Sequence, residues 1–281
     1  MKDAKYIVIS GWGSYPRLLI EGAKKSGVGR IDCLAIKGST DKATWKAADN
    51  VHWITLGGIA DGIRWCGEQG YDGAFLAGQV NPLSLFRGRF DAEVKQWLAE
   101  LSVKNAHTIF GKLSEKFADV GVPILPASCF MDEWMPGVGQ LTERAPSDAE
   151  ASDIAHASAV AHDVGCHDVG QTVVVKSGMV LAVEAFEGTN AAIKRGGKLG
   201  GKGSVVFKAA REGHDMRFDI PVVGLKTIKM MHKVGATALA FQAGRLVLLD
   251  RDEVVRYANA HGIAMVGVDS GLPAAPLRPT H

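Results

Sequence analysis

The sequence predicts an α/β protein, with an N-terminal Rossmann-like domain built on a parallel sheet and a second, mixed α/β domain after it. In residues 6–125, short buried-strand patterns alternate with helical patterns, which is typical of a doubly wound parallel sheet. In the second half, residues 172–175 and 179–184 flank a Gly-containing turn, which predicts an antiparallel hairpin. Residues 132–146 are rich in loop-forming residues and separate the two patterns.

These patterns give the domain bounds. We expect a Rossmann-like domain over residues 1–132, a linker over 133–146 and the second α/β domain over 147–281. The linker ends where Ser147 is followed three residues later by Glu150. That spacing is a capping box, and it predicts a helix from there to Gly165.

The expected elements of the first domain follow in chain order. Apolar runs bounded by glycine or polar residues predict the strands, and apolar residues at helical spacing predict the helices. We expect strands at 6–9, 31–36, 51–56, 73–78 and 122–125, and helices at 17–25, 59–68, 90–101 and 109–117.

In the second domain the same criteria apply. The run Asp250-Arg251-Asp252-Glu253 resembles a second capped helix start, and Gly262 is its expected stop. We expect the 172–184 hairpin, a helix starting near 187–190, strands at 205–207, 215–220, 237–241, 245–249 and 263–268, and helices at 227–233 and after 250.

Composition excludes several classes of protein. The chain has 281 residues and a net charge of +2, so it carries no strong electrostatic signature of nucleic-acid binding. No apolar run reaches the length of a membrane span or a secretory signal, which predicts a soluble, cytoplasmic protein. The four cysteines are widely separated, which argues against a zinc site and fits a reducing compartment.

Charged residues alternate in one stretch of the second half. If residues 215–220 are extended, Asp215, Arg217 and Asp219 share one face, and Met216 and Phe218 share the other. An apolar face can then pack on a core while two carboxylates and a guanidinium face outward. Alternation alone favours an ordinary edge strand with a solvated face.

Neighbouring residues favour metal and phosphate chemistry at this face. The hairpin leads to Glu184 and Glu187, and Glu187 is followed by Gly188 and Thr189. Carboxylates without clustered Cys or His suit a hard cation such as Mg²⁺. Lys208 and Arg217 suit phosphate. Together these residues indicate phosphoryl chemistry, with Asp219, Asp215 and Glu187 as candidate metal ligands.

Two turns in the first domain are candidate substrate contacts. Gly11, Gly13 and Ser14 lie between the first strand and the first helix, where phosphate-binding loops occur. Gln79 and Asn81 follow the strand at 73–78, at the strand end where open parallel sheets bind ligands. A purely structural turn remains open for both. The third glycine of the dinucleotide motif is absent, which argues against an NAD-dependent oxidoreductase.

Three blocks of the sequence resemble the LpxI family, the metal-dependent UDP-2,3-diacylglucosamine pyrophosphatases of lipid A biosynthesis. The blocks are Arg144-Ala145-Pro146-Ser147, residues 168–175 with 180–189, and Lys208 with residues 213–221 and Gly224. The N-terminal turn and the Ala77-Gly78 segment match more loosely. Asn190 stands where the family pattern has an acidic residue.

The resemblance implies hydrolysis of the pyrophosphate of UDP-2,3-diacylglucosamine, giving UMP and 2,3-diacylglucosamine 1-phosphate. It makes residues 147–281 the catalytic domain, with Asp219, Asp215, Arg217 and Lys208 at its centre and Mg²⁺ as cofactor. The implied partners are a lipid-linked UDP-sugar, a second copy of the chain in a homodimer, and the inner membrane in peripheral contact. A non-catalytic protein that binds nucleotide sugars is the alternative.

Overall fold

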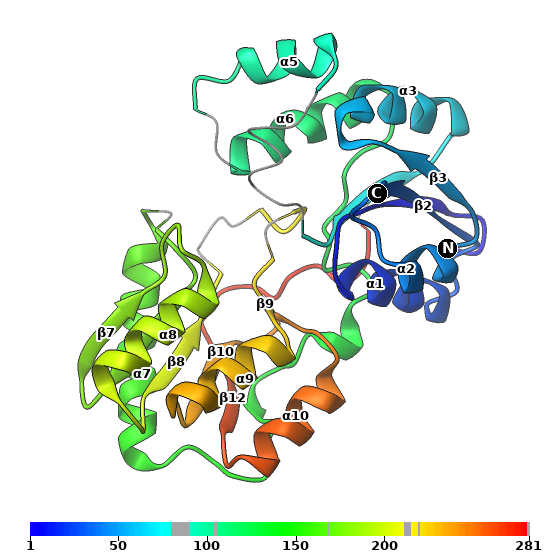
Figure 1. The fold of residues 1–281 in the computed structure, drawn as a ribbon. Coiled ribbons are helices and arrows are strands. Elements are labelled where there is room, and N and C mark those ends of the chain that lie inside the picture. Colours follow the sequence, from blue (N-terminus) through cyan, green and yellow to red (C-terminus); the bar gives the residue numbers. More distant parts are fainter. Residues whose placement is uncertain (80–89, 104–105, 168, 211–214, 219, 280–281) are drawn as a thin grey trace. The chain divides into compact units, whose positions relative to one another are not determined.

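The computed structural model describes residues 1–79, 90–103, 106–167, 169–210, 215–218 and 220–279 (Figure 1). The chain divides into two compact units, which are described separately. Unit 1 comprises Met1–Asp132 together with Asp215–Asp219 and Pro276–His281, and unit 2 comprises Glu133–His214 and Ile220–Ala275. Asn81, His214 and Asp219 lie outside the described residues.

Unit 1 contains a four-stranded sheet in the order β3-β2-β1-β4, with every neighbouring pair parallel. Its strands are β1 (Lys5–Ser10), β2 (Arg30–Ile36), β3 (Val51–Ile54) and β4 (Gly73–Ala77). The strand order reverses between β1 and β4, which is the switch point where open α/β sheets bind ligands. The predicted parallel, Rossmann-like sheet is confirmed.

The helices of unit 1 are α1 (Tyr15–Lys25), α2 (Lys42–Ala47), the short 3-10 helix η1 (Leu56–Gly58), α3 (Ile59–Gln69), α5 (Ala92–Ala99) and α6 (Ala106–Asp119). The predicted helices are confirmed as α1, α3, α5 and α6, whereas α2 and η1 were not predicted. Apolar side chains of β1, β4, α3 and α6 share one core, which includes Ile7, Leu76, Ile63 and Phe117. The expected strand at 122–125 is reduced to one parallel bridge between Ala74 and Ile124.

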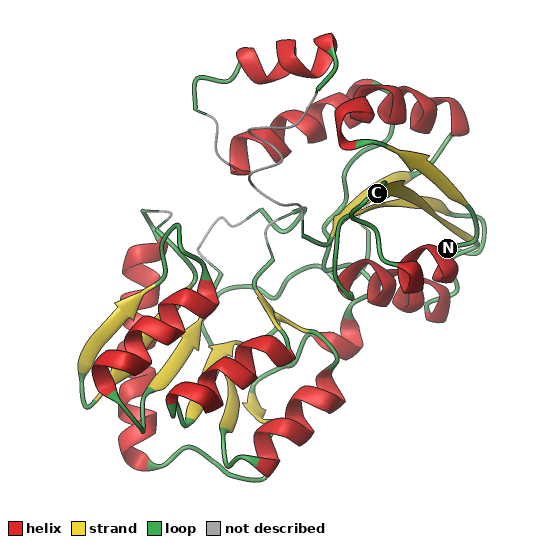
Figure 2. Ribbon diagram, viewed as in Figure 1, coloured by secondary structure: helices red, strands yellow, loops and turns green. Residues whose placement is uncertain are grey.

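Unit 2 contains a six-stranded mixed sheet in the order β5-β12-β10-β8-β6-β7 (Figure 2). Its strands are β5 (Gly139–Gln140), β6 (Thr172–Lys176), β7 (Met179–Val183), β8 (Val205–Lys208), β10 (Ala238–Gln242) and β12 (Ala264–Val268). The three central strands β8, β10 and β12 are parallel, and β5, β6 and β7 add antiparallel pairs. The hairpin prediction is confirmed.

Helices cover both faces of this sheet because its strands are apolar on both sides. On β6, Val173 and Val175 pack with α7 (Asp148–Gly165), whereas Val174 packs on the opposite face. That opposite face is covered by α8 (Thr189–Gly200), α9 (Leu225–Val234) and α10 (Arg251–Ala260). Glycine allows α8 a close approach, since a Cβ on Gly197 would lie 2.3 Å from the Cβ of Val234 on α9.

The capping box at the start of α7 is confirmed. The Ser147 hydroxyl accepts from the backbone N–H of Glu150, and the Glu150 carboxylate accepts from the backbone N–H of Ser147. The second expected helix start is confirmed in position, because Asp250 is the N-cap of α10 and Gly262 follows its end, but the Asp250 side chain makes no cap hydrogen bond and its φ is +51°.

The extended strand expected at 215–220 is also wrong. The described residues Met216, Arg217 and Phe218 form a turn, in which the N–H of Phe218 donates to the carbonyl of Asp215. The Asp215 carboxylate accepts from the Arg217 N–H, a local bond that competes with an extended conformation. After it, the short strands β9 (Val222–Val223) and β11 (Val247–Leu248) pair in parallel.

In the part of the chain that the structure describes, no helix combines the length and apolarity needed to cross a membrane.

Candidate functional site

A buried lysine at the end of β8 organises a polar cluster in unit 2. Lys208 is the last residue of β8, and it pairs in register with Thr172, the first residue of β6. Glu184 follows β7, and its backbone N–H donates to the carbonyl of Thr172. Thr189 begins α8. We call Thr172, Glu184, Thr189 and Lys208 the Lys208 cluster.

The Lys208 cluster is joined by short polar contacts. Lys208 Nζ lies 2.7 Å from Thr189 Oγ1, 3.5 Å from Thr172 Oγ1 and 3.8 Å from Glu184 Oε2. Thr189 Oγ1 lies 3.0 Å from both carboxylate oxygens of Glu184. Since an ammonium only donates, Thr189 accepts from Lys208 and donates its own proton to Glu184. The hydroxyl therefore bridges the two charges.

Burial makes these contacts necessary. The Lys208 side chain is 4% exposed and that of Glu184 is 13% exposed. An isolated charge at such a depth is strongly unfavourable, so each group depends on the other for compensation. The cluster thus holds a cation at a fixed position beside the first turn of α8.

The first turn of α8 adds a second feature of a ligand site. A helix N-terminus has unpaired N–H groups and a partial positive charge, which favour anions. Gly188 precedes the helix with a φ of +82°, a conformation that favours glycine. In the same turn Asn190 Oδ1 is buried and has no hydrogen-bond partner among the described residues. This oxygen is an available acceptor for a donor or a cation.

Glu187, expected as a metal ligand, is engaged by an arginine. Arg195 of α8 donates to Glu187 Oε1 at 2.6 Å, and the Ala185 N–H donates to Oε2 at 3.2 Å. The hydrogen bond from Arg195 lowers the pKa of Glu187, with a further contribution from backbone hydrogen bonding. The carboxylate is therefore held in its charged form beside the α8 N-terminus.

In unit 1, Asp215 and Arg217 form a local ion pair. Arg217 Nε lies 2.9 and 3.1 Å from the two Asp215 oxygens, and one terminal nitrogen lies 2.7 Å from Oδ2. The hydrogen bond to Asp215 raises the pKa of Arg217. The two residues are therefore close together, although they share a turn and not a strand face. Asp219, the third member of the expected face, lies outside the described residues.

In unit 1, backbone hydrogen bonds join the turn that follows β1 to the residues that follow β4. The Gly11 N–H donates to Ala77 O at 2.8 Å, and Trp12 and Gln79 exchange two backbone bonds of 2.8 Å. The Gly13 N–H donates to Asp41 Oδ2 at 2.9 Å. Ser14 is the N-cap of α1 and makes no side-chain cap hydrogen bond.

Chain geometry accounts for the glycines at this turn. A Cβ on Gly11 would lie 2.6 Å from Gln79 O, and Gly13 has a φ of +105°. The structure brings Gly11, Gly13 and Gln79 together, and their role in substrate binding stays a prediction. Asn81 lies outside the described residues.

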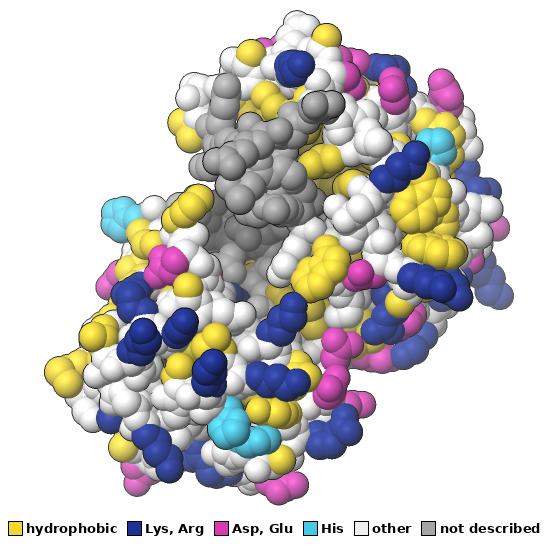
Figure 3. Space-filling view, in the orientation of Figure 1, with side chains coloured by type: hydrophobic (Ala, Val, Ile, Leu, Met, Phe, Trp, Pro, Cys, Tyr) yellow, Lys and Arg dark blue, Asp and Glu magenta, His cyan; other side chains and the backbone are white. Residues whose placement is uncertain are grey.

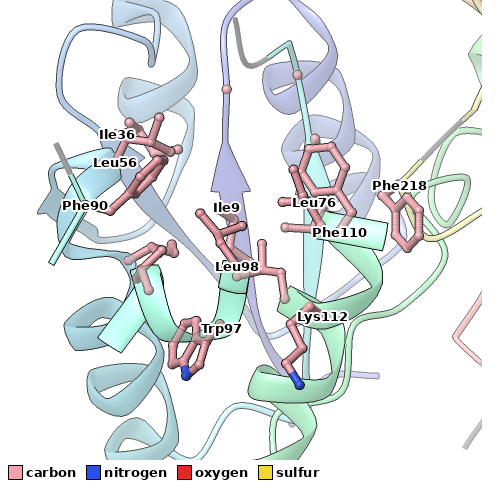
Figure 4. Close-up of a pocket in the computed structure, with 17 residues that line it drawn as sticks. Ile9, Ile36, Leu56, Leu76, Phe90, Trp97, Leu98, Phe110, Lys112 and Phe218 are labelled. Carbon is pink, nitrogen blue, oxygen red and sulfur yellow. The ribbon is translucent and has the colours of Figure 1, made fainter. Parts of the chain in front are cut away.

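Beside this turn lies an apolar pocket of unit 1 (Figure 4). Residues at the ends of β1 and β4 line it, and its atom-free space of about 890 Å³ includes open solvent. Ile9 and Leu76 come from the sheet, Leu98 from α5 and Phe110 from α6. Lys112 is the charged residue among those that line it. The pocket suits a hydrocarbon chain better than a nucleotide.

The predicted residues thus fall into two sets. Lys208, Thr189, Gly188 and Glu187 lie in unit 2, around the N-terminus of α8. The members in unit 1 are the turn residues Gly11, Gly13, Ser14 and Gln79, and the ion pair of Asp215 and Arg217.

The structure singles out several residues whose contacts the sequence did not predict. Thr172 lies in a family-like block without a predicted role, and Glu184 is predicted only as one of the hairpin carboxylates that suit a hard cation. The pairing of Arg195 with Glu187 was not predicted. The two residues are eight positions apart, and the loop and first turns of α8 between them bring their side chains together. The helical spacing within residues 90–101 and 109–117 predicted two helices but not the pocket, because spacing does not distinguish a filled interior from a lined cavity.

The expected metal site is not complete among the described residues, where no group of three or more His, Cys, Asp and Glu side chains could hold an ion. Asp215 is paired with Arg217, Glu187 with Arg195 and Glu184 with Lys208. Asn190 Oδ1 is a suitable oxygen donor without a partner, but one amide oxygen does not make a Mg²⁺ site. The described side chains therefore do not fit the ion by themselves.

Comparison with known proteins matches both halves of the chain. The model of the LpxI N-terminal domain matches residues 5–134, and that of the LpxI C-terminal domain matches residues 137–266. The chain is also 31% identical over 212 residues to the UDP-2,3-diacylglucosamine pyrophosphatase LpxI of Caulobacter vibrioides. That alignment covers 72% of this chain and 76% of the relative.

Proposed function

Because this chain belongs to the LpxI family, we propose that it hydrolyses the pyrophosphate bond of UDP-2,3-diacylglucosamine to UMP and 2,3-diacylglucosamine 1-phosphate. It would act in lipid A biosynthesis, as the sequence resemblance implies. The relative from Caulobacter carries this activity in its name, and the alignment spans most of both proteins.

The apolar pocket of unit 1 is the observation that supports a lipid-bearing substrate. It lies at the switch point of a Rossmann-like sheet, where open α/β sheets bind ligands. Its lining is dominated by aliphatic and aromatic side chains, such as Leu76, Leu98 and Phe110. A polar nucleotide sugar without acyl chains would leave these surfaces unused, whereas an acyl chain would bury them.

Hydrolysis adds water across the P–O–P linkage. The water oxygen bonds to one phosphorus and gives up a proton, and the departing phosphate keeps the electron pair of the broken P–O bond. Lys208 would offset negative charge on the diphosphate as a fixed cation, helped by the N–H groups at the start of α8. Asp219 would orient the attacking water and accept its proton, and Arg217 would bind a phosphate oxygen.

We propose Mg²⁺ as the cofactor. The support is the family resemblance and the carboxylate-rich residue set, which contains oxygen ligands of the kind that Mg²⁺ prefers. A bound Mg²⁺ would supply charge neutralisation at the diphosphate. Asp219, Asp215 and Glu187 remain the proposed ligands, with Asn190 Oδ1 as an added oxygen donor.

The test is UMP release from UDP-2,3-diacylglucosamine by the purified protein. We expect turnover that requires Mg²⁺, stops with EDTA and falls at least about 1000-fold in Asp219→Ala. Asp252→Ala, on the exposed start of α10, is the matched control and should retain wild-type turnover. Binding without UMP release by the wild-type protein would instead identify a non-catalytic nucleotide-sugar binding protein.

We further propose that the protein acts as a cytoplasmic homodimer in peripheral contact with the inner membrane. The support is the family resemblance and the membrane location expected of a diacylated substrate. Light scattering coupled to gel filtration measures the dimer directly, and a mass of one chain across the working concentration range would contradict it.

A further inference from the structure

Basic residues gather on one face of unit 2. No Asp or Glu occurs between residues 188 and 211 or between 220 and 249, although the whole chain has 30 acidic and 32 basic residues. These two segments contain α8 and α9. A nearly neutral protein therefore carries a strongly cationic region on two neighbouring helices.

Helical spacing places these cations on one side of each helix. Lys194, Lys198 and Lys202 recur every four residues along and just beyond α8. Lys229 and Lys233 have the same spacing on α9. We call the exposed cations of this surface the α8–α9 basic face, which comprises Lys194, Arg195, Lys198, Lys202, Lys226, Lys229 and Lys233.

The two helices lie side by side, so their charges form one surface. Gly197 of α8 packs against Val234 of α9, where a larger residue would not fit. Just beyond the helix ends, a Cβ on Gly235 would lie 3.0 Å from the Cα of Lys202. Figure 3 shows the dark-blue side chains of Lys and Arg gathered over this part of unit 2. Arg195 is partly neutralised by Glu187, and the other six cations lie outside that pair.

Large apolar side chains are exposed on α8 and on the segments that precede it. Phe186, in the loop that leads into α8, is 99% exposed, and Leu199 on α8 is 68% exposed. Leu199 is four residues after Arg195 and three before Lys202, which places it among the cations. Met179 and Val180 on the edge strand β7 are also exposed. Exposed apolar residues among lysines are typical of a surface that contacts a lipid interface.

We propose that the α8–α9 basic face docks unit 2 on an anionic phospholipid bilayer, with the lysines at the headgroups and Phe186 and Leu199 entering the interface. Anionic headgroups attract Lys and Arg, and apolar side chains gain by leaving water. This inference rests on the proposed function, because a lipid-linked substrate requires the protein to reach a membrane. It adds which surface of the protein makes that contact. The first turn of α8 belongs to the candidate phosphate site, so one helix would link the membrane to that site.

Vesicle sedimentation with the full-length protein, without substrate, tests the proposal. We expect binding to phosphatidylglycerol-containing vesicles, weak binding to pure phosphatidylcholine, and a partial weakening of the binding to anionic vesicles as salt increases. The variant with Lys194, Lys198, Lys229 and Lys233 all replaced by Gln should bind the anionic vesicles at least about 100-fold more weakly. Phe186→Ser should weaken the binding that remains at high salt.

A matched control removes the same charge elsewhere. Lys2, Lys37, Lys46 and Lys95 are exposed in unit 1, and their fourfold replacement by Gln should leave vesicle binding at the wild-type level. Equal binding by both fourfold variants would overturn the proposal. So would binding to RNA without binding to anionic vesicles, which would identify nucleic acid as the partner.

Turnover distinguishes this inference from the proposed function. The α8–α9 variant should hydrolyse detergent-dispersed substrate at the wild-type rate and lose turnover of substrate embedded in anionic vesicles. Absence of turnover in wild-type protein under both conditions would reject the proposed function, while the sedimentation result would still decide the docking surface. Circular dichroism of each variant verifies that it is folded.

Discussion

The ammonium of Lys208 lies 2.7 Å from the hydroxyl of Thr189, and the same hydroxyl lies 3.0 Å from the Glu184 carboxylate. The Thr189 hydroxyl thus connects two buried charges that are 3.8 Å apart, because it donates its proton to one and accepts a hydrogen bond from the other. Because Thr189 also begins α8, this contact ties the cation at the end of β8 to the N-terminus of a helix. Both features favour a bound phosphate.

Thr189→Val should weaken catalysis by about 10- to 100-fold in kcat/KM, because it keeps the shape of the side chain and removes the bridge. Thr189→Ser, which keeps the hydroxyl, should recover most of the activity. UMP-release kinetics across a range of substrate concentrations would measure both variants. A loss in Ser with Val at the wild-type level would show that the methyl group matters and the bridge does not.

Lys208→Met should lower the free energy of unfolding of unit 2 by about 3–5 kcal/mol, since it leaves Glu184 buried without its cation. The double variant Lys208→Met with Glu184→Gln should recover part of that loss. Urea unfolding of the wild type, both single variants and the double variant gives the coupling energy. Strictly additive effects would contradict an energetic link between the two residues.

Filling the apolar pocket should discriminate against long acyl chains. Leu98→Trp adds volume inside the lining and should lower kcat/KM for long-chain UDP-diacylglucosamine at least about 10-fold, with little effect on a short-chain analogue. Leu101→Trp is the control, because Leu101 is not among the lining residues. If Leu98→Trp slows both substrates equally, the pocket does not bind the acyl chain.

Gly197→Ala should destabilise the packing of α8 on α9 by about 1–3 kcal/mol, because the added Cβ would lie 2.3 Å from the Cβ of Val234. The control is Gly111→Ala in α6, where the new Cβ would meet nothing within 4 Å. Helix propensity predicts that this control is neutral or stabilising by up to about 1 kcal/mol. Thermal unfolding of both variants tests the contrast.

Glu150 should make stability depend on pH in the acid range. Burial by itself raises its pKa, but the hydrogen bond from Arg144, aided by other hydrogen bonds, outweighs burial and lowers the pKa to about 2. The folded value lies below the ordinary value of 4.5, so this stabilisation is present above pH 4.5 and is lost as pH falls towards 2. The stabilisation would be about 3 kcal/mol.

The Glu150→Gln variant tests this. We expect it to be less stable than wild type at neutral pH, with the difference shrinking as pH falls below about 4.5. Urea unfolding at a series of pH values measures the difference. A constant difference between the two proteins from neutral pH to about pH 3 would reject the linkage.

The sequence by itself determined the elements whose signals are local. Ser147 and Glu150 lie one helical turn apart, so their spacing sufficed to predict a capping box. Alternating strand and helix patterns predicted the parallel sheet of unit 1, since each pattern depends on burial of its own residues. The family-like blocks around Glu184, Thr189 and Lys208 were also visible in sequence, although their contacts were not.

Only the tertiary structure decided which of these residues meet, because the deciding contacts join segments far apart in the chain. Asp215 alternates with Arg217 in sequence, yet a carboxylate bond to a backbone N–H closes a turn there. Phe110 has only a helical spacing in sequence, yet it lines a cavity because α6 and the ends of β1 and β4 contribute to the same pocket. Thr189 bridges Lys208 and Glu184 because β8, β7 and α8 converge, and periodicity within one element contains no information on such convergence.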